Sequence, residues 1–215
     1  MSVRTSFDFY NTPVTIHQFT PEKPGKFPVV IALHGSGGMS SEGHLQFAQL
    51  LANQGFAVFV PHYFEPSGVG WASDAIIWRE FPNWMRIIAT AVDHASKHPA
   101  ADPARVGLIG FSLGAYLSLS LAVEDNRIKA VVDFFGGMPE HFAERLNGMP
   151  PVLILHGEQD RTVPVTEAHK LAAVLDSRKL SYEIKIYKNA GHGFGPLDMM
   201  DAAKRAYFFL KKELG

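Results

Sequence analysis

The stretch from Arg105 to Val123, Arg-Val-Gly-Leu-Ile-Gly-Phe-Ser-Leu-Gly-Ala-Tyr-Leu-Ser-Leu-Ser-Leu-Ala-Val, decides which fold this sequence predicts. Val106–Phe111 is a short apolar run typical of a strand buried on both faces, and Leu113–Val123 has the composition of a helix. Between them, residues 110–114 match Gly-x-Ser-x-Gly, a pattern that would arise by chance about 0.1 times in a chain of this composition. So sharp a turn predicts strained backbone at Ser112, and the flanking glycines remove Cβ atoms that would clash. We therefore expect the serine hydroxyl to project above the sheet.

The same alternation of apolar runs and helical spacing fills the rest of the chain. Further strands are predicted at Val29–Leu33, Phe56–Pro61, Ala130–Phe135, Val152–His156 and Tyr182–Tyr187, and a hairpin at Phe7–Tyr10 and Val14–Gln18. Helices are predicted at Glu42–Asn53, Pro82–Lys97, Thr166–Ser177 and Leu197–Leu214, with a short extra helix at Ser73–Arg79. This alternation predicts one α/β domain, residues 1–215, with a mostly parallel, doubly wound sheet. Sites in such sheets form at the carboxyl ends of the strands.

Composition excludes several other classes of protein. The chain has 215 residues, a net charge of −1 and no cysteine. This length fits one sizeable core, and the charge argues against a nucleic-acid partner. The lack of cysteine removes disulfides, thiolate metal sites and a cysteine nucleophile. The first residues lack the apolar stretch of a signal peptide, and no apolar run approaches the ~20 residues of a membrane helix, so we expect a cytoplasmic protein without a membrane partner.

Two strand-end residues are candidates for the partners that a nucleophilic serine needs. His192 lies in a glycine-rich loop after the last predicted strand and can act as the base. Asp160 follows the strand Val152–His156 and can hold the imidazole in the required tautomer. Asp133 is the main competitor, but it lies inside a predicted strand rather than after one. The chain order serine, aspartate, histidine is the one expected when such a triad is built on this kind of sheet.

The sequence also predicts an oxyanion hole and a substrate pocket beside these three residues. The oxyanion formed during acyl transfer needs two donors, for which we expect the Leu113 amide and that of Ser36, with Gly37 as the alternative. The substrate pocket is expected to be aromatic, with candidates His62, Trp71, Trp78, Phe111 and Phe194. The histidines that end strands, His34 and His156, are expected to support the rim. His94 and His98 have a spacing that can bind metal, but a surface helix explains them better, and we predict no metal.

Four motifs together resemble a known family. They are His34-Gly-Ser-Gly-Gly38, the serine motif at 110–114, His156-Gly-Glu-Gln-Asp-Arg-Thr-Val-Pro164 and Gly191-His-Gly-Phe194. In this order the chain resembles the dienelactone-hydrolase branch of the α/β-hydrolases, from about Val14 to Leu210. The resemblance implies an eight-stranded sheet, hydrolysis of an ester or lactone through an acyl-enzyme, and no cofactor. Dienelactone hydrolase itself has a cysteine where this chain has Ser112.

The sequence therefore predicts a serine hydrolase without a large cap domain. The segment between Phe135 and Val152 is too short to carry such a cap, which favours a small ester, lactone or thioester as substrate. A peptidase or an acyltransferase would use the same three residues. A non-catalytic binding protein on the same scaffold is the alternative from another class, because a fold does not fix a function. The oligomeric state is not encoded in any pattern that we can interpret.

Overall fold

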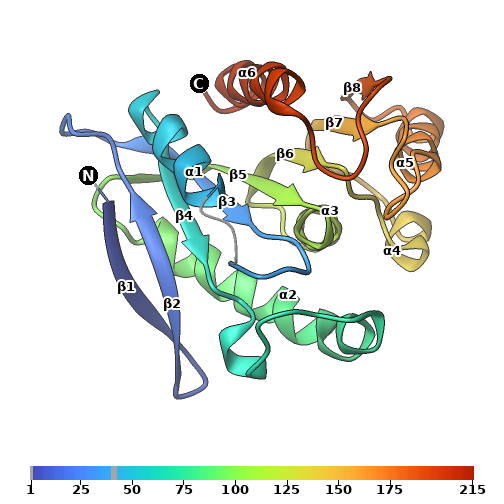
Figure 1. Ribbon diagram of the computed structural model, residues 1–215. Coiled ribbons are helices and arrows are strands. Elements are labelled where there is room, and N and C mark those ends of the chain that lie inside the picture. The colour runs from blue at the N-terminus through green and yellow to red at the C-terminus, as the bar shows by residue number, and fades with distance from the viewer. Residues whose placement is uncertain (1, 40–42) are drawn as a thin grey trace.

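The computed structural model describes residues 2–39 and 43–215, and its eight strands form one sheet in the order β1-β2-β4-β3-β5-β6-β7-β8 (Figure 1). The strands are β1 (Ser2–Phe9), β2 (Thr12–Phe19), β3 (Phe27–Leu33), β4 (Ala57–Pro61), β5 (Ala101–Phe111), β6 (Ile128–Phe134), β7 (Val152–Gly157) and β8 (Tyr182–Tyr187). β2 is antiparallel to β1 and β4, and the pairs from β4 onward are parallel. The predicted fold class is confirmed.

Helices cover both faces of the sheet. They are α1 (Gly43–Asn53), α2 (Asp74–Ser96), α3 (Leu113–Glu124), α4 (Glu140–Glu144), α5 (Thr166–Ser177) and α6 (Pro196–Leu214), with a 3₁₀ turn η1 (Glu65–Ser67). Buried residues of α1 and α6 pack on one face of the sheet, and those of α2, α3 and α5 on the other (Figure 1). The predicted first residue of α1, Glu42, lies outside the described residues. In the described part of the chain, no helix combines the length and the apolarity needed to cross a membrane.

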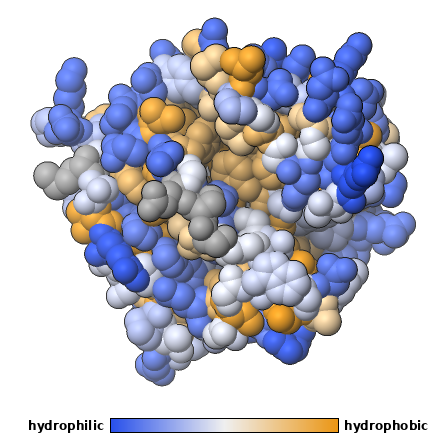
Figure 2. All heavy atoms as spheres, viewed as in Figure 1, coloured by the Kyte–Doolittle hydropathy of each residue, from blue (hydrophilic) through white to orange (hydrophobic). Residues whose placement is uncertain are grey.

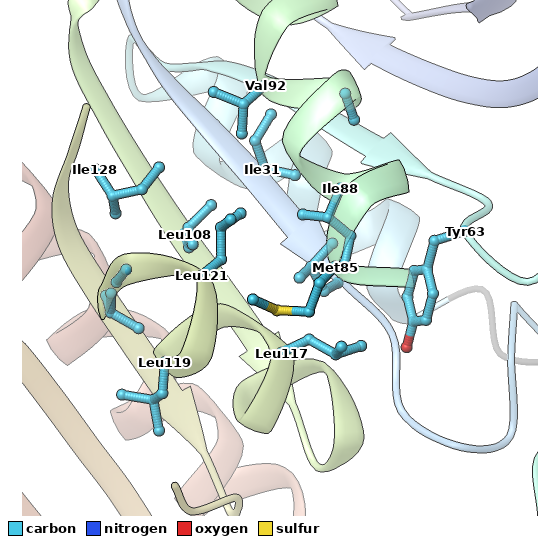
Figure 3. Packing of buried hydrophobic residues seen from close by; sticks show 14 of the residues in the cluster. Ile31, Tyr63, Met85, Ile88, Val92, Leu108, Leu117, Leu119, Leu121 and Ile128 are labelled. Atoms are coloured by element: carbon cyan, nitrogen blue, oxygen red, sulfur yellow. The ribbon is translucent and has the colours of Figure 1, made fainter. Parts of the chain in front are cut away.

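The larger core lies between the sheet and helices α2 and α3. Met85 and Ile88 of α2 meet Leu117 of α3 above the strand residues Ile31 and Leu108 (Figure 3). The last four of these side chains are completely buried. Because α3 starts directly after β5, this packing fixes the first turn of α3, and with it Ser112, relative to the sheet.

The helix α2 is longer than the sequence predicted. The prediction of a short helix ending at Arg79 and a second one starting at Pro82 is wrong, because α2 runs unbroken from Asp74 to Ser96 with Pro82 inside it. A proline inside a helix costs about 3 kcal/mol, since it removes a hydrogen bond and crowds the preceding turn. Burial of apolar side chains on both sides of the proline offsets that cost, with Ile77 and Phe81 packed against the core and Trp84 fully buried.

Candidate active site

The turn between β5 and α3 holds Ser112 in a strained conformation. Its backbone has φ 54° and ψ −118°, which side-chain-bearing residues rarely adopt. A Cβ on Gly110 would lie 2.2 Å from the carbonyl oxygen of Gly114. One on Gly114 would lie 2.4 Å from the carbonyl oxygen of Leu33 in β3. Glycine is therefore required at both positions, and the steric reason that the sequence suggested for the motif agrees with this packing.

Ser112, His192 and Asp160 form a continuous hydrogen-bonded chain. His192 Nδ1 lies 2.8 Å from Asp160 Oδ2, and His192 Nε2 lies 2.9 Å from Ser112 Oγ. An ionised carboxylate only accepts hydrogen bonds, so Nδ1 carries the hydrogen of the neutral ring. The lone pair of Nε2 then faces the serine hydroxyl. This is the arrangement in which an imidazole can take the proton of a nucleophilic serine.

The carboxylate of Asp160 is held by the turn that follows β7. The side chain is buried, and its Oδ1 accepts the amide hydrogens of Thr162 and Val163, each at 2.9 Å. The carbonyl of Val163 accepts a hydrogen bond from His156 Nε2 at 2.8 Å. The two amides thus occupy Oδ1, while Oδ2 lies 2.8 Å from His192 Nδ1 and 3.5 Å from His156 Nε2. His156 thus supports the rim, the role that the sequence suggested for it.

The loop that carries His192 packs over the end of β7. A Cβ on Gly157 would lie 2.4 Å from the carbonyl oxygen of Ala190, so this glycine lets the loop approach closely. The ring of Phe135 stands edge-on to the His192 ring, with centroids 5.0 Å apart. Phe135 itself has a φ of 46°, a second strained residue at the site. We did not predict a role for Phe135, although it comes directly after a strand, which is where such residues are found.

The backbone amides expected to bind an oxyanion border Ser112. Gly35 passes so close that an added Cβ would lie 3.2 Å from Ser112 Cβ. Leu113 is the first residue of α3, so its amide has no acceptor within the helix. Among the described residues, the amides of Leu113, Ser36 and Gly37 donate to no other backbone carbonyl. The assignment of Leu113 with Ser36 or Gly37 remains a prediction that this geometry allows.

Two cavities meet at Ser112, one on each side of it. We call the first, of about 840 Å³, the α1–α6 cavity because residues of α1 and α6 line most of it. The second, of about 920 Å³, is the α2–α5 cavity, lined mainly by residues of the helices α2 to α5. Figure 2 shows hydrophobic side chains around a hollow in this face of the molecule. Tyr116, in the α2–α5 cavity, could have been predicted, since it lies one helical turn after Ser112.

The five pocket residues suggested by the sequence are divided in the structure. Phe111 lines the α1–α6 cavity and Trp78 lines the α2–α5 cavity. The other three lie outside the described linings of both cavities. His62 stacks on His17 and lies 3.4 Å from Glu65, and Trp71 is exposed. Phe194 packs against Phe135 and Tyr187 instead.

Two other buried titratable groups, His34 and Asp133, lie directly after β3 and in β6, the strands on either side of β5. Burial lowers the pKa of His34 to about 3, so the ring is neutral; it stacks on Tyr63, whose hydroxyl donates to the carbonyl of His34. Burial raises the pKa of Asp133 to about 7. Its Oδ1 accepts the amide hydrogen of Gly136 at 2.7 Å. Asp133 is not the carboxylate that contacts His192, because His192 Nδ1 lies 2.8 Å from Asp160 Oδ2.

Histidine pairs on the surface form no metal centre in the described residues. No group of three histidine, aspartate or glutamate side chains there is placed to hold an ion. His94 Nε2 instead lies 3.2 Å from Gln18 Nε2, and His98 Nδ1 accepts the amide hydrogen of Ala100.

The sheet, the strained serine turn and the placement of the three side chains define an α/β-hydrolase. Residues 15–207 match the model of the dienelactone hydrolase family, so the chain belongs to that family. A dienelactone hydrolase-like promiscuous phosphotriesterase from metagenomic libraries has the same fold, with a TM-score of 0.85 at 20% identity over 100% of this chain and 99% of that one. The acylaminoacyl peptidase of Pyrococcus horikoshii has it too, with a TM-score of 0.84 at 19% identity over 100% of this chain and 42% of that one.

Among proteins of known sequence, mouse acyl-coenzyme A thioesterase 1 is 30% identical over 67% of this chain and 33% of its own length. The chain thus spans about a third of the length of that thioesterase, and a similar share of an uncharacterized peptidase of Bacillus subtilis that it also matches. The family and these relatives support a hydrolase.

Proposed function

We propose that this hydrolase cleaves a small carboxylic ester, lactone or thioester through an acyl-enzyme on Ser112. The observation that carries the proposal is the continuous chain from Ser112 through His192 to Asp160, with the serine oxygen at the junction of two cavities. A serine hydroxyl is a weak nucleophile unless a base accepts its proton, and here a base is within 2.9 Å. The scheme needs water and a small-molecule substrate, and no cofactor.

The proposed reaction follows from the roles that the geometry gives to each group. Ser112 Oγ attacks the carbonyl carbon while His192 Nε2 takes the hydroxyl proton, and the resulting imidazolium is stabilised by Asp160. The Leu113 amide, with that of Ser36 or Gly37, binds the negative oxygen of the tetrahedral intermediate. The carbon–oxygen or carbon–sulfur bond then breaks, and His192 gives its proton to the leaving group. A water molecule, deprotonated by His192, releases the acid and restores Ser112.

Covalent labelling and kinetics test the nucleophile. A fluorophosphonate should label the wild-type protein at Ser112, and Ser112→Ala should lower kcat for an activated ester by about 10⁴-fold or more, because the covalent route is lost. The melting temperature of the variant should stay at or above that of the wild type, since alanine removes only the hydroxyl. Wild-type rates in Ser112→Ala, or labelling at another residue, would refute the proposal. No labelling together with no hydrolysis would favour a binding protein.

A peptidase or an acyltransferase remains the alternative for the same three residues. The comparison that separates them is the rate on a p-nitrophenyl ester against an aminoacyl anilide, each with and without an acceptor alcohol. A faster reaction with the anilide would identify a peptidase, and an alcohol-dependent product would identify an acyltransferase. The cytoplasmic location and the extent of the domain, residues 1–215, likewise stay predictions.

A further inference from the structure

The two cavities that meet at Ser112 differ in which catalytic groups line them. His192 lines the α1–α6 cavity and is absent from the described lining of the α2–α5 cavity. Leu113, the expected oxyanion donor, lines the α2–α5 cavity, and Ser36 and Ser112 line both. The α1–α6 cavity is therefore next to His192, the proposed proton donor, and the α2–α5 cavity is on the side of Ser112 away from it.

This difference assigns a part of the substrate to each cavity. In the tetrahedral intermediate the former carbonyl carbon bears the serine oxygen, the oxyanion, the leaving group and the acyl substituent. The leaving group has to lie beside His192, because that residue gives it a proton as the bond breaks. On the basis of the serine mechanism proposed above, we propose that the alcohol or thiol lies in the α1–α6 cavity and the acyl chain in the α2–α5 cavity, and that both are uncharged, apolar groups of several carbons.

The lining of the α2–α5 cavity favours an apolar acyl group over an anionic one. Leu113 and Leu171 are buried apolar side chains there, and Tyr116 adds a hydroxyl whose raised pKa, caused first by burial, keeps it protonated. The charged lining residues are mostly acidic: Asp74, Glu140 and Glu167 against one cation, Lys170. That lysine is already paired with Glu167 at 2.7 Å. Among the described lining residues, a carboxylate at the end of the acyl chain would meet like charges and no unpaired cation.

The lining of the α1–α6 cavity favours an apolar leaving group. Phe47, Leu50, Met199 and Met200 supply apolar surface from α1 and α6. Among the described lining residues there is no lysine, arginine, aspartate or glutamate. A phosphorylated carrier thiol would find no cation there to neutralise its charges, whereas an alkyl or aryl alcohol would bury apolar area.

The volumes of both cavities argue against a substrate whose acyl group or alcohol is very small. Their volumes of about 840 and 920 Å³ lie in the upper part of the range of pockets for drug-sized ligands, which is about 300–1,000 Å³. An acetyl or a methyl group would leave most of either cavity to water. We therefore expect kcat/KM to rise by about two- to fourfold for each methylene that becomes buried on either side of the ester.

Two ester series and two matched variants test the assignment. The acyl series is methyl acetate to methyl octanoate, and the alcohol series is methyl acetate to octyl acetate, each followed by pH-stat titration of the released acid. Ala143→Leu fills space in the α2–α5 cavity and Ala203→Leu fills space in the α1–α6 cavity, both from partly buried helical positions. Ala143→Leu should lower kcat/KM about tenfold for the long acyl esters only, and Ala203→Leu by a similar factor for the long alcohol esters only.

Two further variants guard against misfolding. Trp78→Ala and Met200→Ala truncate lining residues that are 78% and 67% exposed, so neither should disturb the core. Each should lower kcat/KM about threefold for the long members of its own series. Methyl hydrogen succinate should react at least tenfold more slowly than methyl pentanoate, because its carboxylate enters an acidic cavity.

The outcomes separate this inference from the proposed function. If fluorophosphonate does not label Ser112 and no ester of either series is hydrolysed, the proposed function itself fails. If Ser112 is labelled and esters are hydrolysed, but the variants act on the opposite series or on both series equally, the assignment of the cavities is overturned. Faster hydrolysis of methyl hydrogen succinate than of methyl pentanoate would overturn the claim that the acyl group is uncharged. Faster hydrolysis of a thioester of a phosphorylated carrier than of a simple alkyl thioester would overturn the same claim for the leaving group.

Discussion

The turn that carries Ser112 and the loop that carries His192 are held in place by different means. Around Ser112 the backbones of β3, β5 and α3 are so close that added Cβ atoms at Gly110 and Gly114 would lie 2.2–2.4 Å from other backbone atoms. In the His192 loop, a Cβ on Gly193 would meet no atom within 4 Å. The imidazole is instead positioned by its bond to Asp160 and by the edge of the Phe135 ring. Ser112 thus has close backbone contacts on both sides of its turn. The His192 loop has them only before the histidine, where the carbonyl oxygens of Ala190 and Gly191 approach Gly157, and beyond that point the ring depends on side-chain contacts.

A short turn after β6 connects these two regions. Phe135 reaches His192, while a Cβ on the next residue, Gly136, would lie 2.4 Å from Ala115 Cβ and 3.0 Å from the Ser112 carbonyl oxygen. The buried carboxyl of Asp133 accepts the amide hydrogen of Gly136 and so fixes the turn to the end of β6. Changes in the serine turn should therefore affect stability more than catalysis. Changes at the side-chain contacts of His192 should affect catalysis more than stability.

Among changes to the contacts of His192, replacing the carboxylate that orients it should give the largest effect on catalysis. In Asp160→Asn the amide group presents a donor or a weaker acceptor to Nδ1, so the ring is no longer held with its Nε2 lone pair toward Ser112. We expect kcat to fall by about 10⁴-fold. The melting temperature of the unlabelled protein should change little. The measurement is kcat at the plateau of the pH profile. Asp133→Asn is the matched control, and a larger loss of kcat in that variant would make Asp133 the catalytic acid instead.

Adding one methyl group to the serine turn should give the largest effect on stability. In Gly114→Ala the new Cβ would meet the carbonyl oxygens of Leu33 and His34 at 2.4 and 2.6 Å, and backbone atoms cannot move aside as a flexible side chain can. We expect a loss of about 3 kcal/mol or more in the free energy of unfolding, measured by urea titration. A loss below about 1 kcal/mol would show that β3 and α3 adjust freely, and that the turn is not fixed by sterics.

The two regions also differ in how well the sequence predicts them. The serine turn could be predicted because its strand, glycines and helix are consecutive. Asp160 and His192 could be proposed although they are distant in sequence, because parallel strands bring their carboxyl ends to one edge. The cavity walls depend on strand order, which no local pattern encodes. His62 follows β4, which β3 separates from β5, so it stacks on His17 of β2 rather than lining the described part of either cavity.

The buried carboxyl of Asp133 should make stability depend on pH. Its pKa of about 7 in the folded protein lies above the ordinary value of 3.8, so between these values the folded state keeps a proton that the unfolded state loses. Stability therefore falls as the pH rises from about 4 to about 7, and is constant above that as far as this group is concerned. His34 contributes the opposite slope, since its folded pKa of about 3 lies below its ordinary value of 6.5.

The variant Asp133→Asn removes the pH dependence of stability that is due to Asp133 and leaves the one that is due to His34. Relative to the wild type, its free energy of unfolding should increase by about 2–3 kcal/mol between pH 5 and pH 7.5. Urea titrations of both proteins at the two pH values give this difference directly, and the contribution of His34 cancels. Equal pH dependence in the two proteins would show that Asp133 keeps its ordinary pKa and that burial is not the controlling influence.

The smallest effect should come from the glycine of the histidine loop, which is the counterpart of Gly114. Gly193 has a φ of 87° but no atom near its missing Cβ, so Gly193→Ala pays only for an unfavourable backbone conformation. We expect a loss of about 1 kcal/mol in stability and a fall in kcat of a few-fold, because Asp160 and Phe135 still hold the ring. Urea titration and ester hydrolysis measure both. If Gly193→Ala were as destabilising as Gly114→Ala, the loop would be held as tightly as the serine turn, and the contrast between the two regions would disappear.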